Sequence, residues 1–291
     1  IYTDPFWGEL TKGLTGYEFG IGAYLEAGFH LFWGIFHQIS GLSWLTIFKY
    51  FPSLIFIITV LSVYILARRE GFGWEAAFFT CLIPTTVGIL GPGFLVPVAL
   101  GLPFIPLSLF LVFNFRIWWS YLVLFIFICF LLSMHAATAV GLAIILAPYI
   151  LLNLRSNFRH CLWIILALAT PFLGLFPWIF NILLPTAKSL FSQQPFPDYI
   201  KIPSITEAYG YLPMLFCSLG IFLLTLRGGK KRYSLVLGLA ALMLMLVIFS
   251  TFHYGVPIMY YRGLMYMMLM VSIVAGAGLM EVKNLKFILM F

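Results

Sequence analysis

Long runs of apolar residues, separated by short polar stretches, fill the sequence from residue 47 onward. A helix needs about 20 such residues to cross the hydrocarbon core of a bilayer. Nine runs approach or reach that length, at 47–67, 73–91, 94–113, 118–134, 136–153, 161–184, 210–226, 234–251 and 264–280. The pattern predicts an all-α protein, a polytopic transmembrane bundle of about nine spans over residues 47–291.

The composition agrees with this prediction. Hydrophobic residues make up 63% of the 291 positions and charged residues 9%, with a mean hydropathy of +1.07. Soluble domains have roughly 45–50% apolar and about 25% charged residues. The net charge is +7, but its only dense basic cluster, 227–232, lies between two apolar runs, which excludes a nucleic-acid partner. The four cysteines lack CxxC spacing and indicate neither a zinc site nor a disulfide framework.

Lysine and arginine divide unevenly between the two alternating sets of loops. One set holds eleven of them and the other holds five. The larger set is Arg68, Arg69, Arg116, Arg155, Arg159, Arg227, Lys230, Lys231, Arg232, Lys283 and Lys286; the smaller is Lys12, Lys49, Lys188, Lys201 and Arg262. Because positively charged loops stay in the cytoplasm, we predict a multi-pass cell-membrane protein with an extracytoplasmic N-terminal stretch.

That N-terminal stretch, residues 1–46, is predicted to form a separate outer segment. Residues 1–20 are polar and glycine-rich, and 21–39 have a helical pattern that includes Glu26, His30 and His37. Aromatic and ionisable residues alternate there with aliphatic ones, which favours a helix lying in the outer interface. A tenth crossing is the alternative, and it would move the acids of residues 1–20 to the cytoplasmic side.

Both ends of the sequence have the character of cut ends. Residue 1 is Ile and no signal-peptide pattern follows it, while 287–291 resemble the first turn of a further apolar helix. We therefore expect a fragment truncated at both ends, with one more span before Ile1.

Two acids in the outer segment are candidate catalytic residues. Asp4 is followed by Pro5, which restrains the backbone beside the carboxylate, and Glu9 comes five residues later. Such a carboxylate could serve as a general base or a metal ligand at the membrane surface. The alternative is an ordinary acid in a solvated loop.

Two basic side chains at predicted outer span ends are candidate phosphate ligands. His135 stands between the fourth and fifth runs, and Arg262 follows two tyrosines just before the ninth. Arginine suits bidentate phosphate binding, and histidine can contact a phosphate or a sugar hydroxyl. The alternatives are an interhelical hydrogen bond for His135 and an interfacial anchor for Arg262.

The order of several short motifs resembles the GT-C superfamily of membrane glycosyltransferases, which includes oligosaccharyltransferase catalytic subunits and protein mannosyltransferases. The resemblance covers most of residues 1–155 and lies in layout and short phrases. These are Thr3-Asp4-Pro5, Gly16-Tyr17-Glu18-Phe19-Gly20, Phe51-Pro52-Ser53-Leu54, a span ending Tyr64-Ile65-Leu66-Ala67-Arg68-Arg69, and Met134-His135-Ala136-Ala137-Thr138-Ala139.

The resemblance implies a function at the extracytoplasmic face. Enzymes of this superfamily transfer a sugar from a polyprenyl-phosphate carrier to an acceptor. An acid in their first outer loop binds the acceptor, acts as base or helps to hold a divalent metal such as Mg²⁺ or Mn²⁺, and Asp4 is the matching position. The expected partners are thus membrane lipid and a polyprenyl-phosphate-linked sugar.

Departures from the superfamily indicate a divergent member or an inactive relative. The second outer loop, Gly91-Pro92-Gly93, has no acid nearby, and Trp118-Trp119 is followed by Ser120 rather than by Asp. Two other classes stay open. A transporter or lipid flippase would need polar groups lining a path across the membrane, and a non-catalytic membrane protein would need no convergence of the outer acids.

Overall fold

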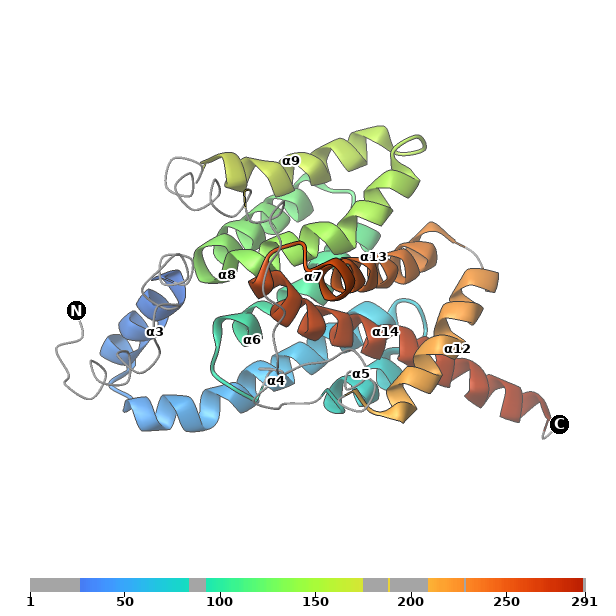
Figure 1. Ribbon diagram of the computed structural model, residues 1–291, viewed down its shortest axis with the longest axis horizontal. Helices are drawn as coiled ribbons and strands as arrows, with labels where there is room; N and C mark the ends of the chain where they lie inside the picture. Colours follow the sequence, from blue (N-terminus) through green and yellow to red (C-terminus); the bar gives the residue numbers. More distant parts are fainter. Residues whose placement is uncertain (1–26, 84–92, 175–187, 189–208, 228, 290–291) are drawn as a thin grey trace.

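The structure, a computed structural model, describes residues 27–83, 93–174, 188, 209–227 and 229–289. Its helices are α3 (Ala27–Ser40), α4 (Trp44–Arg68), α5 (Gly73–Cys81), α6 (Pro97–Gly101), α7 (Phe104–Asn114), α8 (Trp118–Asn153), α9 (Phe158–Gly174), α12 (Tyr211–Arg227), α13 (Lys230–Phe252) and α14 (Pro257–Leu289) (Figure 1). No β-strand occurs among these residues. The predicted all-α class is confirmed.

Five of the described helical segments are long and apolar enough to cross a membrane. They are Trp44–Arg68, Pro97–Asn114, Trp118–Asn153, Lys230–Phe252 and Met259–Asn284. Helices α9 and α12 are apolar but shorter. The structure thus has the helices of a multi-pass membrane protein, whereas the count of nine spans stays a prediction.

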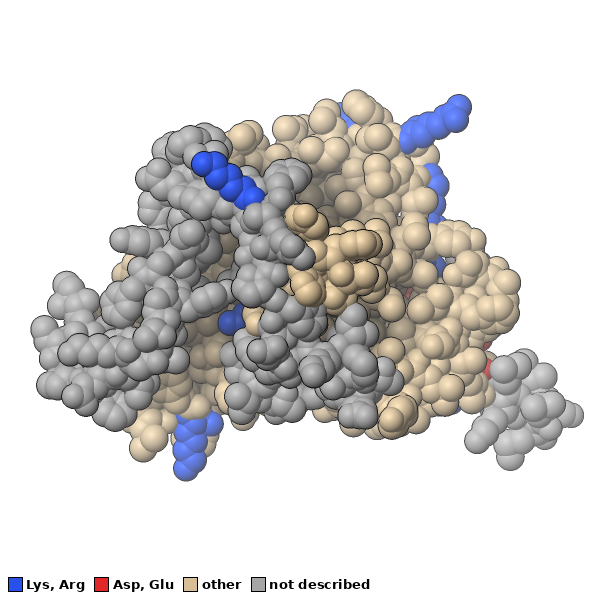
Figure 2. Space-filling model, viewed as in Figure 1, with Lys and Arg blue, Asp and Glu red and all other residues tan. Residues whose placement is uncertain are grey.

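The outer surface of the bundle suits lipid. Large apolar side chains are widely exposed on it, for example Leu45 (79% exposed), Trp74 (75%) and Phe222 (60%). Figure 2 shows one face of the molecule, on which charged side chains of the described residues are few. In water such a surface would drive aggregation, whereas its exposure to lipid acyl chains carries no free-energy penalty.

Helix α8 is a hairpin. His160 Nδ1 lies 2.7 Å from the Tyr121 hydroxyl, and His160 Nε2 lies 3.3 Å from the Tyr149 hydroxyl. A straight helix would separate those tyrosines by about 42 Å, at a rise of about 1.5 Å per residue. Arg116 and Asn157, just outside the two ends of α8, are also hydrogen-bonded, at 3.1 Å. The chain therefore reverses direction inside α8.

The reversal occurs at His135, whose backbone leaves the helical region with φ −160° and ψ 89°. The two arms, 118–134 and 136–153, coincide with the fourth and fifth predicted runs.

His160 of α9 connects the far ends of these two arms to α7, and its imidazole is neutral. His160 Nε2–H donates to the Val112 carbonyl at 3.2 Å, since a carbonyl only accepts, so Nδ1 accepts from Tyr121.

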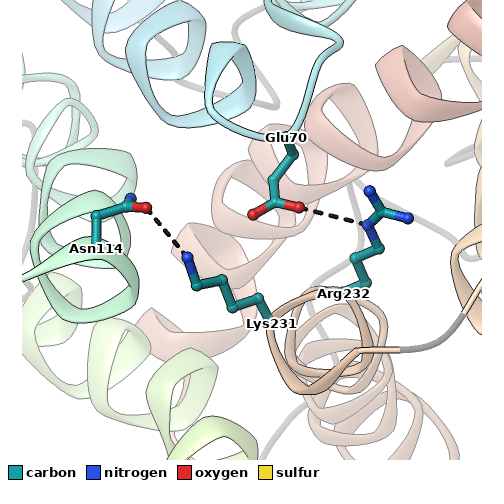
Figure 3. Close-up of polar contacts among 4 residues, drawn as sticks. All are labelled: Glu70, Asn114, Lys231 and Arg232. Carbon is teal, nitrogen blue, oxygen red and sulfur yellow. Dashed lines mark hydrogen bonds and ion pairs between the residues drawn. The ribbon is translucent and has the colours of Figure 1, made fainter.

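Opposite the hairpin turn, polar side chains from distant helices meet, and we call this region the basic end. Arg232 pairs with Glu70 at 3.4 Å and Lys231 donates to Asn114 at 3.1 Å (Figure 3). Lys283 pairs with Glu75 at 2.5 Å. Every lysine and arginine in these contacts belongs to the larger basic set. The loops that the sequence assigns to one side of the membrane therefore lie at one end of the bundle.

The turn at His135 defines the opposite, apex end. Helix α3 packs there: the Phe32 and Phe130 rings are 6.4 Å apart, and the Trp33 and Phe51 rings are 5.1 Å apart. Helix α3 thus bridges the hairpin tip and the start of α4 (Figure 1). This is compatible with the predicted interfacial helix, of which the structure describes the part from Ala27 onward.

Helix α14 is the centre of the bundle. Every residue from 263 to 278 is buried, and α5, α8, α12 and α13 all pack against this helix. Being apolar on every side, it suits a helix enclosed by others. It continues unbroken to Leu289. The expectation that residues 287–291 begin a new helix is therefore wrong for 287–289, because they extend the same hydrogen-bonded helix.

Candidate functional site

His135 and Arg262, which are 127 positions apart in sequence, lie together at the apex end. His135 Nδ1 is 2.7 Å from Thr138 Oγ1, which is 2.9 Å from the Tyr266 hydroxyl. The Tyr266 hydroxyl is also 3.4 Å from Nδ1, which closes a small ring of hydrogen bonds. The Arg262 guanidinium is near enough to act on the imidazole electrostatically. We call these four residues the apex cluster.

Helix geometry sets the depth of the apex cluster. Arg262 and Tyr266 are four apart on α14 and so share one face. Arg262 is 21 residues from Lys283, which at about 1.5 Å per residue separates the apex cluster from the basic end by about 32 Å. The hydrocarbon core of a bilayer is about 30 Å thick. The two groups of polar residues are therefore spaced to lie at its opposite boundaries.

Small residues let the helices approach closely around the apex cluster. A Cβ atom at Gly101 would come within 2.9 Å of the Thr138 side chain, and one at Gly141 within 2.7 Å of the Tyr266 ring. Helix α6 therefore packs closely against α8 at Thr138, and α8 packs closely against α14 at Tyr266. Tyr209 adds a further restraint, since its hydroxyl donates to the Leu264 carbonyl at 2.5 Å.

The electrostatics of the apex cluster favour an anion. The Nε atom of Arg262 is buried and has no hydrogen-bond partner in the described part of the chain. The described acids all lie toward the basic end: Glu70 and Glu75 form the ion pairs above, and Glu281 is two residues before Lys283. The Arg262 side chain is half-buried, and leaving a buried N–H of a guanidinium without an acceptor is costly. Together with the imidazole and two hydroxyls, the guanidinium could bind a phosphate.

The predicted catalytic acids cannot be placed beside this cluster. Asp4 and Glu9 lie outside the described residues, as does Glu26. Among the residues that are described, no group of three or more His, Cys, Asp or Glu side chains could hold a metal ion. Asp4 stays the only predicted metal ligand.

Sequence reasoning missed Tyr266 as a member of the apex cluster. A signal was present, because Tyr266 follows Arg262 by one helical turn and so shares its face. Thr138 follows His135 by three residues and joins the ring from the second arm of α8. The 2.9 Å contact between Thr138 and Tyr266 depends on how α8 packs on α14, which no local pattern encodes.

No protein-family model matches the chain, and no curated protein matches it either.

Proposed function

We propose that this protein is a glycosyltransferase of the GT-C type, which transfers a sugar from a polyprenyl-phosphate carrier to an acceptor at the extracytoplasmic face. One observation supports the proposal above the others: Arg262, whose buried Nε has no hydrogen-bond partner in the described part of the chain, lies near the ordered His135 at the end of the bundle opposite the basic residues. The basic end would be cytoplasmic. The apex cluster would then lie where a carrier phosphate meets the outer membrane surface.

In this proposal each member of the apex cluster has a distinct role. Arg262 binds the carrier phosphate through charge-assisted hydrogen bonds. Tyr266 donates to Thr138 and Thr138 donates to Nδ1 of His135, so that Nε2 carries the ring hydrogen and serves as a donor to the phosphate or the sugar. Gly101 and Gly141 keep the hydroxyls in place by allowing close helix packing.

The transfer would be a single displacement. The acceptor hydroxyl attacks the anomeric carbon of the sugar, the bond from that carbon to the phosphate oxygen breaks, and polyprenyl phosphate leaves. Asp4 would take the proton of the acceptor hydroxyl or hold the acceptor, with Glu9 nearby. Arg262 would stabilise the negative charge that develops on the departing phosphate.

Most buried hydroxyl groups of the described residues argue against the transporter alternative, and Ser108, whose buried Oγ has no hydrogen-bond partner among those residues, is an exception. Thr59, Ser62, Thr80 and Ser272 lie inside the bundle, but each donates to a carbonyl three or four residues earlier in its own helix. Side chains satisfied in this way do not line a polar path. The structure therefore favours a site at one end over a route through the middle, as far as the described residues show.

The test measures lipid binding and sugar transfer separately in the full-length protein. With undecaprenyl phosphate as the binding probe, Arg262→Gln should weaken binding by about tenfold or more, because a charge-assisted hydrogen bond contributes about 1.5–3 kcal/mol. With an undecaprenyl-phosphate hexose labelled in the sugar, Asp4→Asn should abolish transfer while leaving binding intact.

A matched control and two contrary outcomes complete the design. Arg155→Gln removes an arginine from the loop between α8 and α9 and should change neither measurement. Retained transfer by Asp4→Asn would remove Asp4 from the mechanism. Unchanged binding by Arg262→Gln would remove the apex cluster from the donor site.

A further inference from the structure

A groove of about 1080 Å³ opens between the first arm of α8 and helix α9, well away from the apex cluster. Its mouth at the basic end is lined by Arg116, Ser156, Asn157 and Arg159. Its walls are formed by aromatic and aliphatic side chains: Trp118, Tyr121, Leu122, Phe125, Trp163, Leu166 and Ala167. It exceeds the roughly 300–1,000 Å³ typical of small-molecule pockets, and it does not belong to the site described above.

The charges at the mouth of the groove are positive and uncompensated by acid. No Asp or Glu lines it, and Arg159 is exposed without a hydrogen bond or ion pair to any described residue. Arg116 uses one guanidinium nitrogen on Asn157 and keeps its other donors available. The mouth suits an anionic group.

The length of the groove matches one leaflet of a bilayer. Along α9 it runs from Arg159 to Thr170, which is about 16 Å at a rise of about 1.5 Å per residue. Half of the hydrocarbon core is about 15 Å thick. An acyl chain whose headgroup sits at the two arginines would therefore lie against the apolar walls as far as the middle of the membrane.

We infer that this groove binds an anionic glycerophospholipid of the leaflet at the basic end, which is the cytoplasmic leaflet under the positive-inside rule. The phosphate contacts Arg116 and Arg159, and one acyl chain lies between α8 and α9. Basic pockets between transmembrane helices on the cytoplasmic side are a known type of lipid site. The binding is independent of the transferase proposal, since it uses none of the residues of the apex cluster.

Native mass spectrometry of the purified protein tests this inference with two lipids that share their acyl chains. Palmitoyl-oleoyl phosphatidylglycerol should bind at least about fivefold more tightly than the matching phosphatidylcholine. Arg159→Gln should reduce that preference by about fivefold, and Arg159→Lys should restore it. Because Arg159 has no described partner, its replacement leaves the fold intact. Arg155→Gln, in the loop just before α9 and outside the groove, should have no effect.

Two further measurements distinguish the contribution of the acyl chain to binding from that of the headgroup. Ala167→Trp fills the apolar part and should weaken both lipids while leaving the preference for the anionic one. Glycerol 3-phosphate carries the charge without a chain and should not displace phosphatidylglycerol. Equal affinity for the two lipids, an unaltered preference in Arg159→Gln, or displacement by glycerol 3-phosphate would each overturn the inference.

Discussion

Single polar side chains make the long-range connections in this apolar protein. His160 joins Tyr121 in the first arm of α8 to the Val112 carbonyl in α7, with both ring nitrogens used. The apex cluster does the same between the hairpin tip and α14. In a bundle where apolar packing differs little from contact with lipid, such hydrogen bonds help to specify which helices meet.

Replacing Tyr121 with Phe should destabilise the protein by about 1–3 kcal/mol. The substitution leaves the buried Nδ1 of His160 without its donor, and an unsatisfied buried acceptor costs that much. Thermal unfolding in detergent measures the effect. Tyr233→Phe is the control, because its hydroxyl bond to the Thr225 carbonyl is exposed and should contribute little. Equal losses of stability in the two variants would contradict a special role for His160.

Pairs of helices in this bundle approach closely where glycine faces a backbone. A Cβ atom at Gly278 of α14 would collide with the Phe216 carbonyl of α12, and one at Gly220 of α12 would collide with the Val274 carbonyl of α14. The two glycines are thus reciprocal parts of one contact. Small residues of this kind commonly set the separation of membrane helices.

Gly278→Ala should separate α12 from α14 and destabilise the protein by about 1–3 kcal/mol, the usual cost of overpacking. Gly34→Ala in α3 is the matched control, because no atom lies within 4 Å of its added Cβ. It should be neutral or stabilise by up to about 1 kcal/mol, since alanine is the better helix former. Comparable unfolding temperatures for the two variants would show that α12 and α14 do not meet as described.

For the whole molecule, the separation of the basic end from the apex end is the main feature. Lys231 and Arg232 of α13 contact Asn114 and Glu70, which are far from them in sequence (Figure 3). Lys283 of α14 pairs with Glu75, and all three cations belong to the larger basic set. The orientation of these two ends follows from the positive-inside rule.

Single cysteines introduced into a cysteine-free background should label from opposite sides of the cell membrane. Ser40→Cys, at the end of α3, should react with an impermeant maleimide in intact cells. Arg155→Cys, between α8 and α9, should react only after the membrane is permeabilised. The reverse pattern would invert the orientation and place the apex cluster in the cytoplasm.

Local pattern predicted much of the fold. The runs 118–134 and 136–153 were separable because His135 interrupts the apolar sequence, and the hairpin turns there. The third run, predicted as one span, corresponds to one candidate spanning segment, Pro97–Asn114, in which Pro103 separates α6 from α7. Proline marks such a break without showing whether a helix continues past it, because neighbouring helices can satisfy the carbonyls that it leaves free.

The candidate sites were less predictable. His135 and Arg262 stand out because basic residues at the predicted outer span ends are few, but their proximity depends on the packing of α8 on α14. The sequence pattern did not predict the groove between α8 and α9. Once the turn at His135 is known, Tyr121 and Tyr149 fall at the same level, since each is fourteen residues from it. That symmetry could have directed attention to His160 and the neighbouring groove.

The role of Arg262 is tested most directly by comparing undecaprenyl phosphate with undecaprenol, which differs only in lacking the phosphate. Wild-type protein should bind the phosphate form at least about tenfold more tightly, and Arg262→Gln should bind both lipids with the same low affinity. If the wild type does not distinguish the two lipids, or if Arg262→Gln distinguishes them as well as the wild type does, the apex cluster is not a phosphate site.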